Sequence, residues 1–557
     1  MPASTQSTFS AIAGNDRFLL PLVCFLMFIK RFLLLDYGYN YEEGKELECV
    51  INILNGKMIY RDFFWQYGPG PLYVFALLFK IFGEVNFLIP RGVVSLVAVL
   101  TTFYSYRVAR IYLPAPWAFW AALMASSGLA AREGTYGHGF AYLGMIASFY
   151  YLLRFFKRES SENSLIASGL FVFMALLSKP IVFGAGAVVS GLFGLGLWTL
   201  CKPAKQLPWI PIAKFLAAGL LPAFFVFGYL FWHTPTNLFI ASLLPMTSGS
   251  LSLGEFNIKP LFPPIPAAPW QEWLTGLNKY LVDSFRWWTI LLTVAGGIGV
   301  IIKGCFRDGK SFHGYFFLVI LLIYALLVES ETIILIQRPI TFYINMLPSY
   351  ILLAMFLIWL KEKMTGAVFV RSVALIFCIT YFFYPPIRLG LYYWTNTKPL
   401  ALKYAENIKV PDYTRTTYRN IAEYIQKHTP PEKPIVFAGY NSFIYLSSNR
   451  ASLFPEDFAT FTRVSFHPYH SGKAPFPKAF YKKAEAKIVE RIQTGSASMI
   501  LIPKAYLEEN NLKKSVFLQY LVKNWKSRGV LNSGLRPGPF DKVDLTLEVF
   551  VREGKNG

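Results

Sequence analysis

Apolar segments long enough to cross a bilayer alternate with short polar segments through residues 18–384, and the alternation ends near residue 394. Residues 181–200, 210–232 and the shorter 287–302 are examples. A helix needs about 20 consecutive, mainly apolar residues to cross a bilayer. The pattern therefore predicts a polytopic α-helical membrane protein with about 11 to 13 transmembrane helices.

Residues 395–557 lack such segments and have the composition of a soluble domain. Their pattern predicts helices at residues 421–428, 479–493 and 516–525, and strands at 434–440, 498–503 and 545–553. Strands that alternate with helices favour a small α/β domain with a mixed sheet. We therefore divide the chain into a transmembrane domain, residues 1–394, with a first external loop at 36–83, and a soluble external α/β domain, residues 395–557.

Composition supports a membrane protein, because 54% of the 557 residues are hydrophobic and 17% are aromatic. The formal net charge of +22 is explained first by loop lysines and arginines that face the cytoplasm and anionic lipid, so we expect no nucleic-acid partner. The first apolar run lacks the flanks of a signal peptide, and we interpret it as a retained helix. The five cysteines are scattered and show neither a disulfide framework nor a CxxC metal motif.

Clusters of basic residues assign the two sides of the membrane by the positive-inside rule. The clusters predicted to be cytoplasmic are Arg107 and Arg110; Arg154, Lys157 and Arg158; Lys202 and Lys205; Lys303, Arg307 and Lys310; and Lys361 and Lys363. Counting crossings between them places the loop at residues 36–70 and the tail outside. If the short apolar segment 72–82 were a span, Arg107 and Arg110 would lie outside, so we predict that it is a juxtamembrane helix in the interface.

The first external loop begins with a charged amphipathic helix, predicted over residues 41–54. Its apolar residues have the i, i+3, i+4, i+7 spacing of one helix face. They are Leu47, Val50, Ile51 and Leu54. The turn-forming pair Asn55-Gly56 then ends the helix.

Charged residues of this helix occupy two different positions around its axis. At about 100° per residue, Glu42 and Lys45 point together away from the apolar stripe. Glu43 lies near the stripe, where a carboxylate needs a partner. Glu43 also fits a capping box with Asn40 as the N-cap, so a purely structural role remains an alternative for it.

The segment YNYEEGKELECVINILNGKMIYRDFFWQYGPGPLYVFALLFKIFG, residues 39–83, resembles the first external loop of a known superfamily. This is the GT-C superfamily of polyprenyl-phosphate-sugar-dependent glycosyltransferases, in particular the branch of protein O-mannosyltransferases and lipid A aminoarabinose transferase. The shared features are an acidic pair that opens a loop helix, a G-x-x-x-Y-R-D-F-F-like segment, a turn with Pro and Gly, and a juxtamembrane helix. The family usually has Asp first in the acidic pair, where this chain has Glu42. The resemblance continues more weakly through LLSKPIVF, residues 176–183, and RPITFYINMLPSYILL, residues 338–353.

The resemblance implies a GT-C fold and the transfer of a sugar from a polyprenyl phosphate to an acceptor hydroxyl or amine in one inverting displacement. This chemistry needs a carboxylate that removes the acceptor proton and cations that hold the leaving phosphate. By position in the acidic pair, Glu42 is the expected general base and Glu43 its supporting partner. Lys45 and Arg61 are expected to bind the donor phosphate, although an ion pair with Asp62 is an alternative role for Arg61.

Further candidates come from the other resembling segments. Lys179 and Arg338 are expected to contact the donor sugar or phosphate, with snorkelling to lipid headgroups as the alternative. Glu133 and His138, on the loop between two predicted spans, are secondary candidates, as is Asp62. No His or Cys spacing indicates zinc, and the resemblance implies no required metal, although acids on several external loops are compatible with a divalent cation.

The implied partners are a polyprenyl-phosphate-linked sugar donor, a lipid, glycan or protein acceptor, and the lipid bilayer. The resemblance favours a bacterial cytoplasmic membrane, with several spans and with the tail on the periplasmic side. Two other classes stay open as alternatives. A transporter or flippase for a lipid-linked saccharide would also need many helices and buried charge, and a catalytically inactive membrane scaffold would need only a tail that binds a partner.

Overall fold

A computed structural model describes several helices of the bundle, the first external loop and much of the tail. The described residues are 16–126 (without 34, 39, 40, 64 and 66), 136–156, 162–200, 209–236, 347–363, 397–438, 443–453, 478–507, 515–531 and 546–552, with a few isolated positions. Residues 240–346, which hold several predicted spans, lie outside the described residues. The number of spans therefore stays a prediction.

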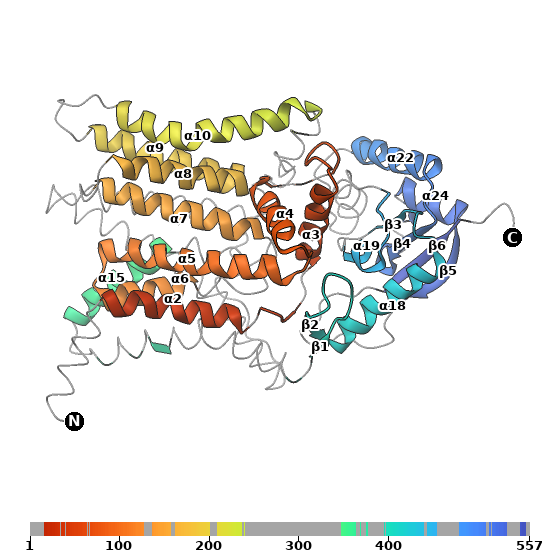
Figure 1. The fold of residues 1–557 in the computed structure, drawn as a ribbon, viewed down its shortest axis with the longest axis horizontal. Coiled ribbons are helices and arrows are strands. Elements are labelled where there is room, and N and C mark those ends of the chain that lie inside the picture. The colour runs from red at the N-terminus through yellow and green to blue at the C-terminus, as the bar shows by residue number, and fades with distance from the viewer. Residues whose placement is uncertain are drawn as a thin grey trace.

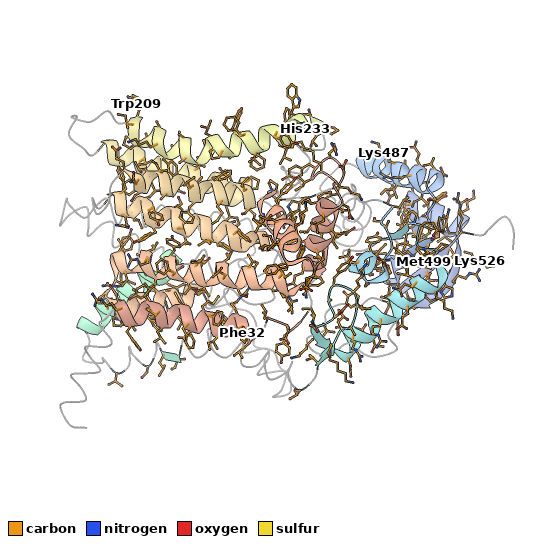
Figure 2. All side chains as sticks on the ribbon, in the orientation of Figure 1. Phe32, Trp209, His233, Lys487, Met499 and Lys526 are labelled. Carbon is orange, nitrogen blue, oxygen red and sulfur yellow. The ribbon has the colours of Figure 1, made fainter. Side chains whose placement is uncertain are left out.

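Apolar helices of the transmembrane domain lie side by side in a bundle (Figure 1). They are α2 (Asp16–Phe32), α5 (Leu88–Tyr112), α6 (Ala115–Ser126), α7 (Tyr136–Phe156), α8 (Asn163–Ser178), α9 (Ala185–Leu200), α10 (Trp209–Trp232) and α15 (Leu347–Lys363). Within the described ranges, three helices are long and apolar enough to span a membrane, namely Leu88–Tyr112, Gly137–Phe156 and Trp209–Trp232. Phe32 and His233 mark the end of the bundle nearer the tail, and Trp209 marks the opposite end (Figure 2).

The first external loop folds into two helices at the end of the bundle that faces the tail (Figure 1). Helix α3 (Tyr41–Leu54) has the bounds that the apolar spacing predicts. Helix α4 (Gly70–Phe82) ends at Gly83, whose positive φ of 72° suits a residue without a side chain. With 13 residues, α4 is too short to cross a bilayer as a helix.

Helix α4 is apolar on both its buried and its exposed faces. Leu72, Phe75, Ala76 and Phe79 are buried at i, i+3, i+4, i+7 spacing. On the other face, Leu77, Ile81 and Phe82 are 58%, 66% and 62% exposed. Such a helix favours a position between the protein and the membrane interface, in agreement with the predicted juxtamembrane helix.

The tail contains a four-stranded mixed sheet in the order β3-β4-β6-β5. The strands are β3 (Ile435–Phe437), β4 (Met499–Pro503), β5 (Lys526–Leu531) and β6 (Leu547–Val551). β3 is parallel to β4, and β6 is antiparallel to both β4 and β5. The three predicted strands are therefore confirmed as β3, β4 and β6. β5 was not predicted, because five of its six residues are exposed and its sequence KSRGVL has no apolar alternation.

Helices and a short ribbon complete the tail. The helices are α18 (Asp412–His428), α19 (Phe443–Ser448), α22 (Lys478–Thr494) and α24 (Val516–Asn524). The ribbon pairs β1 (Thr397–Pro399) with β2 (Lys409–Pro411) in antiparallel fashion. The boundary at residues 394 and 395 stays a prediction.

One apolar cluster joins the first external loop to the tail. It contains Leu47 and Val50 of α3, Phe75 of α4, and Phe437 and Tyr445 of the tail, all of them buried. Burial of this shared surface removes apolar area from water, which is the main favourable contribution to packing. The loop helix α3 is consequently held between the bundle and the tail, as Figure 1 shows.

Candidate functional site

The segment that follows α3 is folded by its own polar contacts. Gly56, with a φ of 79°, ends the helix after Asn55. The Asp62 carboxylate accepts a hydrogen bond from the Met58 N–H at 2.7 Å. The Tyr60 hydroxyl donates to the Tyr67 carbonyl at 2.6 Å. These bonds bring the chain back toward the bundle and present the ring of Tyr67 there.

Gly68 docks this segment on the end of α8. Its N–H donates to the Ser178 carbonyl at 3.0 Å. A Cβ atom at Gly68 would lie 2.0 Å from the carbonyl oxygen of Leu177, which real Cβ atoms do not tolerate. A residue without a side chain is therefore required here, and the close approach places Tyr67 beside Lys179.

Lys179 lies at a break between two helices. α8 ends at Ser178, a single π-helical turn covers Pro180–Gly184, and α9 follows. Proline lacks a backbone N–H and disfavours helical conformation in the residue before it, and Lys179 has φ −140° and ψ 86°. The break turns the Lys179 side chain toward the first external loop.

Two lysines flank one pair of aromatic rings. The Lys45 Nζ atom of α3 lies 5.6 Å from the centroid of the Trp65 ring. Trp65 and Tyr67 are in edge contact, with centroids 5.3 Å apart. The Lys179 Nζ atom lies 4.8 Å from the centroid of Tyr67. Lys45 and Lys179, predicted separately as phosphate ligands, are thus each brought against one ring of the same aromatic pair, and ring faces attract cations.

His138, at the start of α7, joins this group. Its Nε2 atom is within hydrogen-bonding distance of the Lys179 Nζ atom. Because an ammonium group only donates, Nε2 of His138 is the acceptor and the ring proton is on Nδ1. The His138 ring also lies 5.8 Å from the Tyr67 ring, centroid to centroid. His138 therefore orients Lys179, which is a role the sequence did not predict for it.

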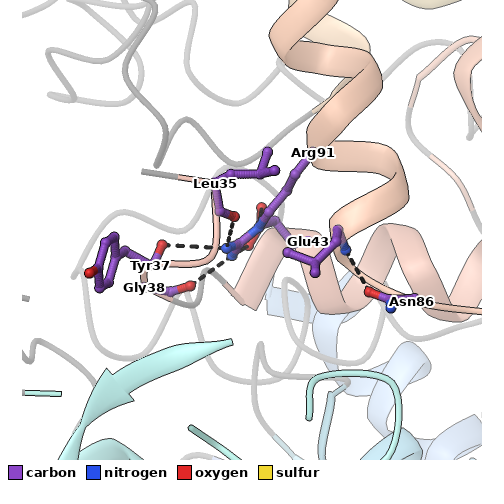
Figure 3. A network of polar contacts seen from close by, with 7 residues as sticks. Leu35, Tyr37, Gly38, Glu43, Asn86 and Arg91 are labelled. Atoms are coloured by element: carbon purple, nitrogen blue, oxygen red, sulfur yellow. Dashed lines mark hydrogen bonds and ion pairs between the residues drawn. The ribbon is translucent and has the colours of Figure 1, made fainter. Parts of the chain in front are cut away.

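Glu43 forms a buried ion pair with Arg91 of α5 (Figure 3). The guanidinium donates from Nε to Oε1 at 3.0 Å and from Nη2 to Oε2 at 2.6 Å. The two side chains are only 4% and 7% exposed. The prediction that the Glu43 carboxylate needs a partner is confirmed. The partner was missed, and its sequence signal was a single arginine in the first turn of the apolar segment LIPRGVVSLV.

The same guanidinium holds the chain that enters the loop. Arg91 donates to the backbone carbonyls of Leu35 at 2.9 Å and Gly38 at 2.7 Å, with a longer bond to Tyr37 (Figure 3). Arg91 therefore links α5, residues 35–38 and α3 through one buried group.

The tail binds the same entry segment. The Lys409 ammonium is 2.8 Å from the Asp36 carboxylate, and this hydrogen-bonded pair raises the pKa of Lys409. The Lys409 N–H donates to the Asp36 carbonyl at 2.7 Å, and the Gly38 N–H donates to the Lys409 carbonyl at 2.8 Å. Asp36 thus binds β2 through both its side chain and its backbone carbonyl.

Arg61 and Asp62 pair with each other. The Arg61 Nε and Nη2 atoms donate to the two Asp62 oxygens at 2.9 and 2.7 Å. The hydrogen bond from Arg61 lowers the pKa of Asp62, and the Met58 N–H and nearby Lys57 lower it further. The ion pair considered as the alternative role of Arg61 is therefore present, with the Arg61 side chain 45% exposed.

Other candidates are described in part or not at all. Glu42 is in the first turn of α3, but its side chain lies outside the described residues, as do Glu133 and Arg338. Two cations that the sequence interpretation left unused, Lys30 and Arg31, are 6% and 7% exposed in the last turn of α2. In the part of the chain that the structure describes, no group of three or more His, Cys, Asp or Glu residues has the arrangement of a metal site.

Comparisons with known proteins identify the fold. No protein-family model matches the sequence, and no curated protein sequence matches it. Among solved structures, ArnT from Cupriavidus metallidurans bound to undecaprenyl phosphate is similar with a TM-score of 0.51 and 14% identity, over 96% of this chain and 97% of that chain. The oligosaccharyltransferase AglB from Archaeoglobus fulgidus, in complex with an inhibitory peptide and a dolichol-phosphate, is similar with a TM-score of 0.50 and 12% identity, over 92% and 73%. Both are GT-C membrane glycosyltransferases, and this chain has their fold.

Proposed function

We propose that this chain is an integral-membrane glycosyltransferase that moves a sugar from a polyprenyl-phosphate donor to a lipid, glycan or protein acceptor of the cell envelope. The observation that carries the proposal is that Lys45 and Lys179 lie against Trp65 and Tyr67, two rings in contact with each other. A departing phosphate needs fixed cations, and the group lies at the tail-facing end of the bundle beside α3. The GT-C fold and the polyprenyl phosphates bound by ArnT and AglB support this assignment.

The reaction is a single inverting displacement at the anomeric carbon of the sugar. Glu42 removes the proton from the acceptor hydroxyl or amine, whose lone pair then forms the new bond to the anomeric carbon. The bond from this carbon to the phosphate oxygen breaks, and its electron pair leaves with the polyprenyl phosphate. Lys45 and Lys179 stabilise the negative charge that the phosphate gains. No metal is required in this scheme, and activity should persist in the presence of a chelator.

Other residues support this chemistry without touching the reacting atoms. Glu43, held by Arg91, positions α3 and with it Glu42. His138 orients Lys179. Arg61 reaches the donor only by leaving Asp62, which makes it a secondary phosphate contact. Arg338 is a further proposed contact to the donor sugar or phosphate, and Glu133 stays a secondary candidate. The site and the tail face the periplasm of a bacterial cell in this proposal.

Deletion of the gene, followed by mass spectrometry of envelope glycolipids and glycoproteins, would identify the product. Complementation with Glu42→Gln should then fail to restore the missing sugar, while the variant accumulates in membranes at the normal amount. Glu84→Gln makes the same chemical change in an exposed residue just after α4 and should restore the product fully. Restoration by Glu42→Gln would reject Glu42 as the base.

A further inference from the structure

A cluster of arginine and tyrosine side chains lies between α5 and α7, far from the proposed catalytic site. Its members are Tyr104 and Arg107 of α5 and Tyr150, Tyr151 and Arg154 of α7. Arg107 follows Arg91 by 16 positions on the same helix. At about 1.5 Å per residue, the two arginines are about 24 Å apart along the axis, which is most of the roughly 30 Å thickness of the hydrocarbon layer. The cluster is therefore at the end of the bundle predicted to be cytoplasmic.

The cluster has more hydrogen-bond donors than its members use among themselves. Arg107 donates from Nε and Nη2 to the Tyr150 hydroxyl oxygen at 3.2 and 3.0 Å. Since this oxygen accepts, the hydroxyl proton of Tyr150 points away from Arg107 and can be donated to a ligand. The hydroxyls of Tyr104 and Tyr151 are 3.4 Å apart, and only one of them can donate to the other. Within the part of the chain that the structure describes, the other hydroxyl proton of this pair is left for a further acceptor.

Positive charge is concentrated at the same ring. The guanidinium carbons of Arg107 and Arg154 lie 5.5 and 5.7 Å from the centroid of Tyr150. Asp16, the acid of α2 at this end of the bundle, accepts hydrogen bonds from Arg110 and from the Tyr106 hydroxyl, each at 2.6 Å. The charge of Asp16 also interacts with Arg107. Two arginines of the cluster face this one described acid, and an anionic oxygen ligand would complement the donors and the charge of the cluster.

An apolar stripe leads from the cluster toward the middle of the membrane. Leu96 and Leu100 of α5 are 59% and 39% exposed. They precede Arg107 by 11 and 7 positions, which at about 100° per residue places all three on one helix face. A ligand with a charged group at Arg107 and a hydrocarbon chain along Leu100 and Leu96 fits this face, whereas a free phosphate ion would use only the charged part.

We propose that this cluster binds the phosphodiester headgroup of an anionic phospholipid from the cytoplasmic leaflet. Arg107 and Arg154 neutralise the phosphodiester, the Tyr150 hydroxyl donates to one of its oxygens, and an acyl chain lies along Leu100 and Leu96. This site is independent of the proposed transferase reaction, because it lies at the other end of α5.

The test is native mass spectrometry of the full-length protein, delipidated in a neutral detergent and incubated with phosphatidylglycerol or phosphatidylcholine. We expect retention of phosphatidylglycerol in preference to phosphatidylcholine. Loss of one charge-assisted hydrogen bond should weaken retention about tenfold in Arg107→Gln and in Tyr150→Phe. The matched control is Lys214→Gln, which removes one positive charge near the start of α10, where Lys214 pairs with Glu162.

Specific outcomes decide the proposal. Equal retention of the two lipids by the wild-type protein would overturn it, as would the same loss in Lys214→Gln as in Arg107→Gln, since a general charge effect would then suffice. Displacement of phosphatidylglycerol by an excess of inorganic phosphate would show that a free anion, not a lipid, occupies the site. If Arg107→Gln does not fold, Tyr150→Phe carries the test, because it keeps the ring and removes only the hydroxyl.

Discussion

Arg91 and Glu43 are 48 positions apart in the sequence and form a two-bond ion pair with almost no solvent exposure. The pair connects the first turn of a long bundle helix to the first turn of the helix that carries the proposed base. A carboxylate and a guanidinium buried together are costly to remove from water, and their contact offsets that cost only while both are present.

Replacement of Arg91 by Met should therefore be strongly destabilising. It leaves the Glu43 carboxylate buried without its guanidinium, and breaking a buried pair in this way costs about 3–5 kcal/mol. Thermal unfolding of the detergent-solubilised protein measures the loss. The double variant Glu43→Met, Arg91→Met should recover a large part of it, and a double variant no more stable than Arg91→Met would contradict the assigned pairing.

Gly68→Ala should displace the loop that carries Tyr67. The added Cβ would lie 2.0 Å from the Leu177 carbonyl oxygen, so the loop must move off the end of α8. Donor binding should weaken because Tyr67 no longer lies against Lys179. Gly92→Ala is the matched control, since no atom lies within 4 Å of a Cβ at Gly92 and its φ is ordinary. Titration with a polyprenyl phosphate should distinguish the two variants, and equal affinities would argue against the close approach.

Lys45→Met and Lys179→Met should each raise the KM for the polyprenyl-phosphate donor about tenfold or more and leave the KM for the acceptor nearly unchanged. The reason is that a charged hydrogen bond to phosphate contributes about 1.5–3 kcal/mol. Steady-state kinetics with each substrate varied in turn provides the measurement. Lys57→Met, in the exposed turn after α3, is the control. A change confined to the KM for the acceptor would assign the two lysines to acceptor binding instead of donor binding.

Glu485 should make the tail less stable as the pH rises. Burial raises the pKa of this carboxyl above its ordinary value of 4.5, although Ser515 and the Val516 N–H donate to it. The folded state therefore holds the proton more tightly than the unfolded state, and its contribution to stability is present in full below pH 4.5 and is lost as the pH rises through the raised pKa. Hydrogen exchange at the start of α24 should report this trend, and Glu485→Gln should flatten it. If stability depended on pH with the same slope in Glu485→Gln, groups other than Glu485 would be responsible for the dependence.

The first external loop could be predicted well because its signals are local. The apolar spacing of Leu47, Val50, Ile51 and Leu54 defined α3 to the bounds it has in the structure, and the short apolar run after it defined most of α4. The predicted strands of the tail were recognisable as runs of apolar residues between polar turns. β5 was not, because an exposed edge strand buries nothing that would impose a pattern on its sequence.

Single residues of the candidate site could be predicted from the sequence, but their contacts with one another could not. Lys45 and Lys179 were identified from separate segments, but their common contact with Trp65 and Tyr67 depends on the close approach at Gly68. Arg91 was missed since its partner is set by tertiary structure and its own neighbours in the sequence are apolar. Residues that act through a long-range contact carry no periodic signal of their own.

The backbone ladder between residues 36–38 and Lys409 has a practical consequence for protein engineering. A chimaera that takes its tail from a relative would inherit a foreign β2 against a native entry segment. Such exchanges should succeed only when the segment leading into α3 and Arg91, which binds that segment, are transferred together with the tail. The segments that must be exchanged together therefore differ from the two domains predicted from the sequence.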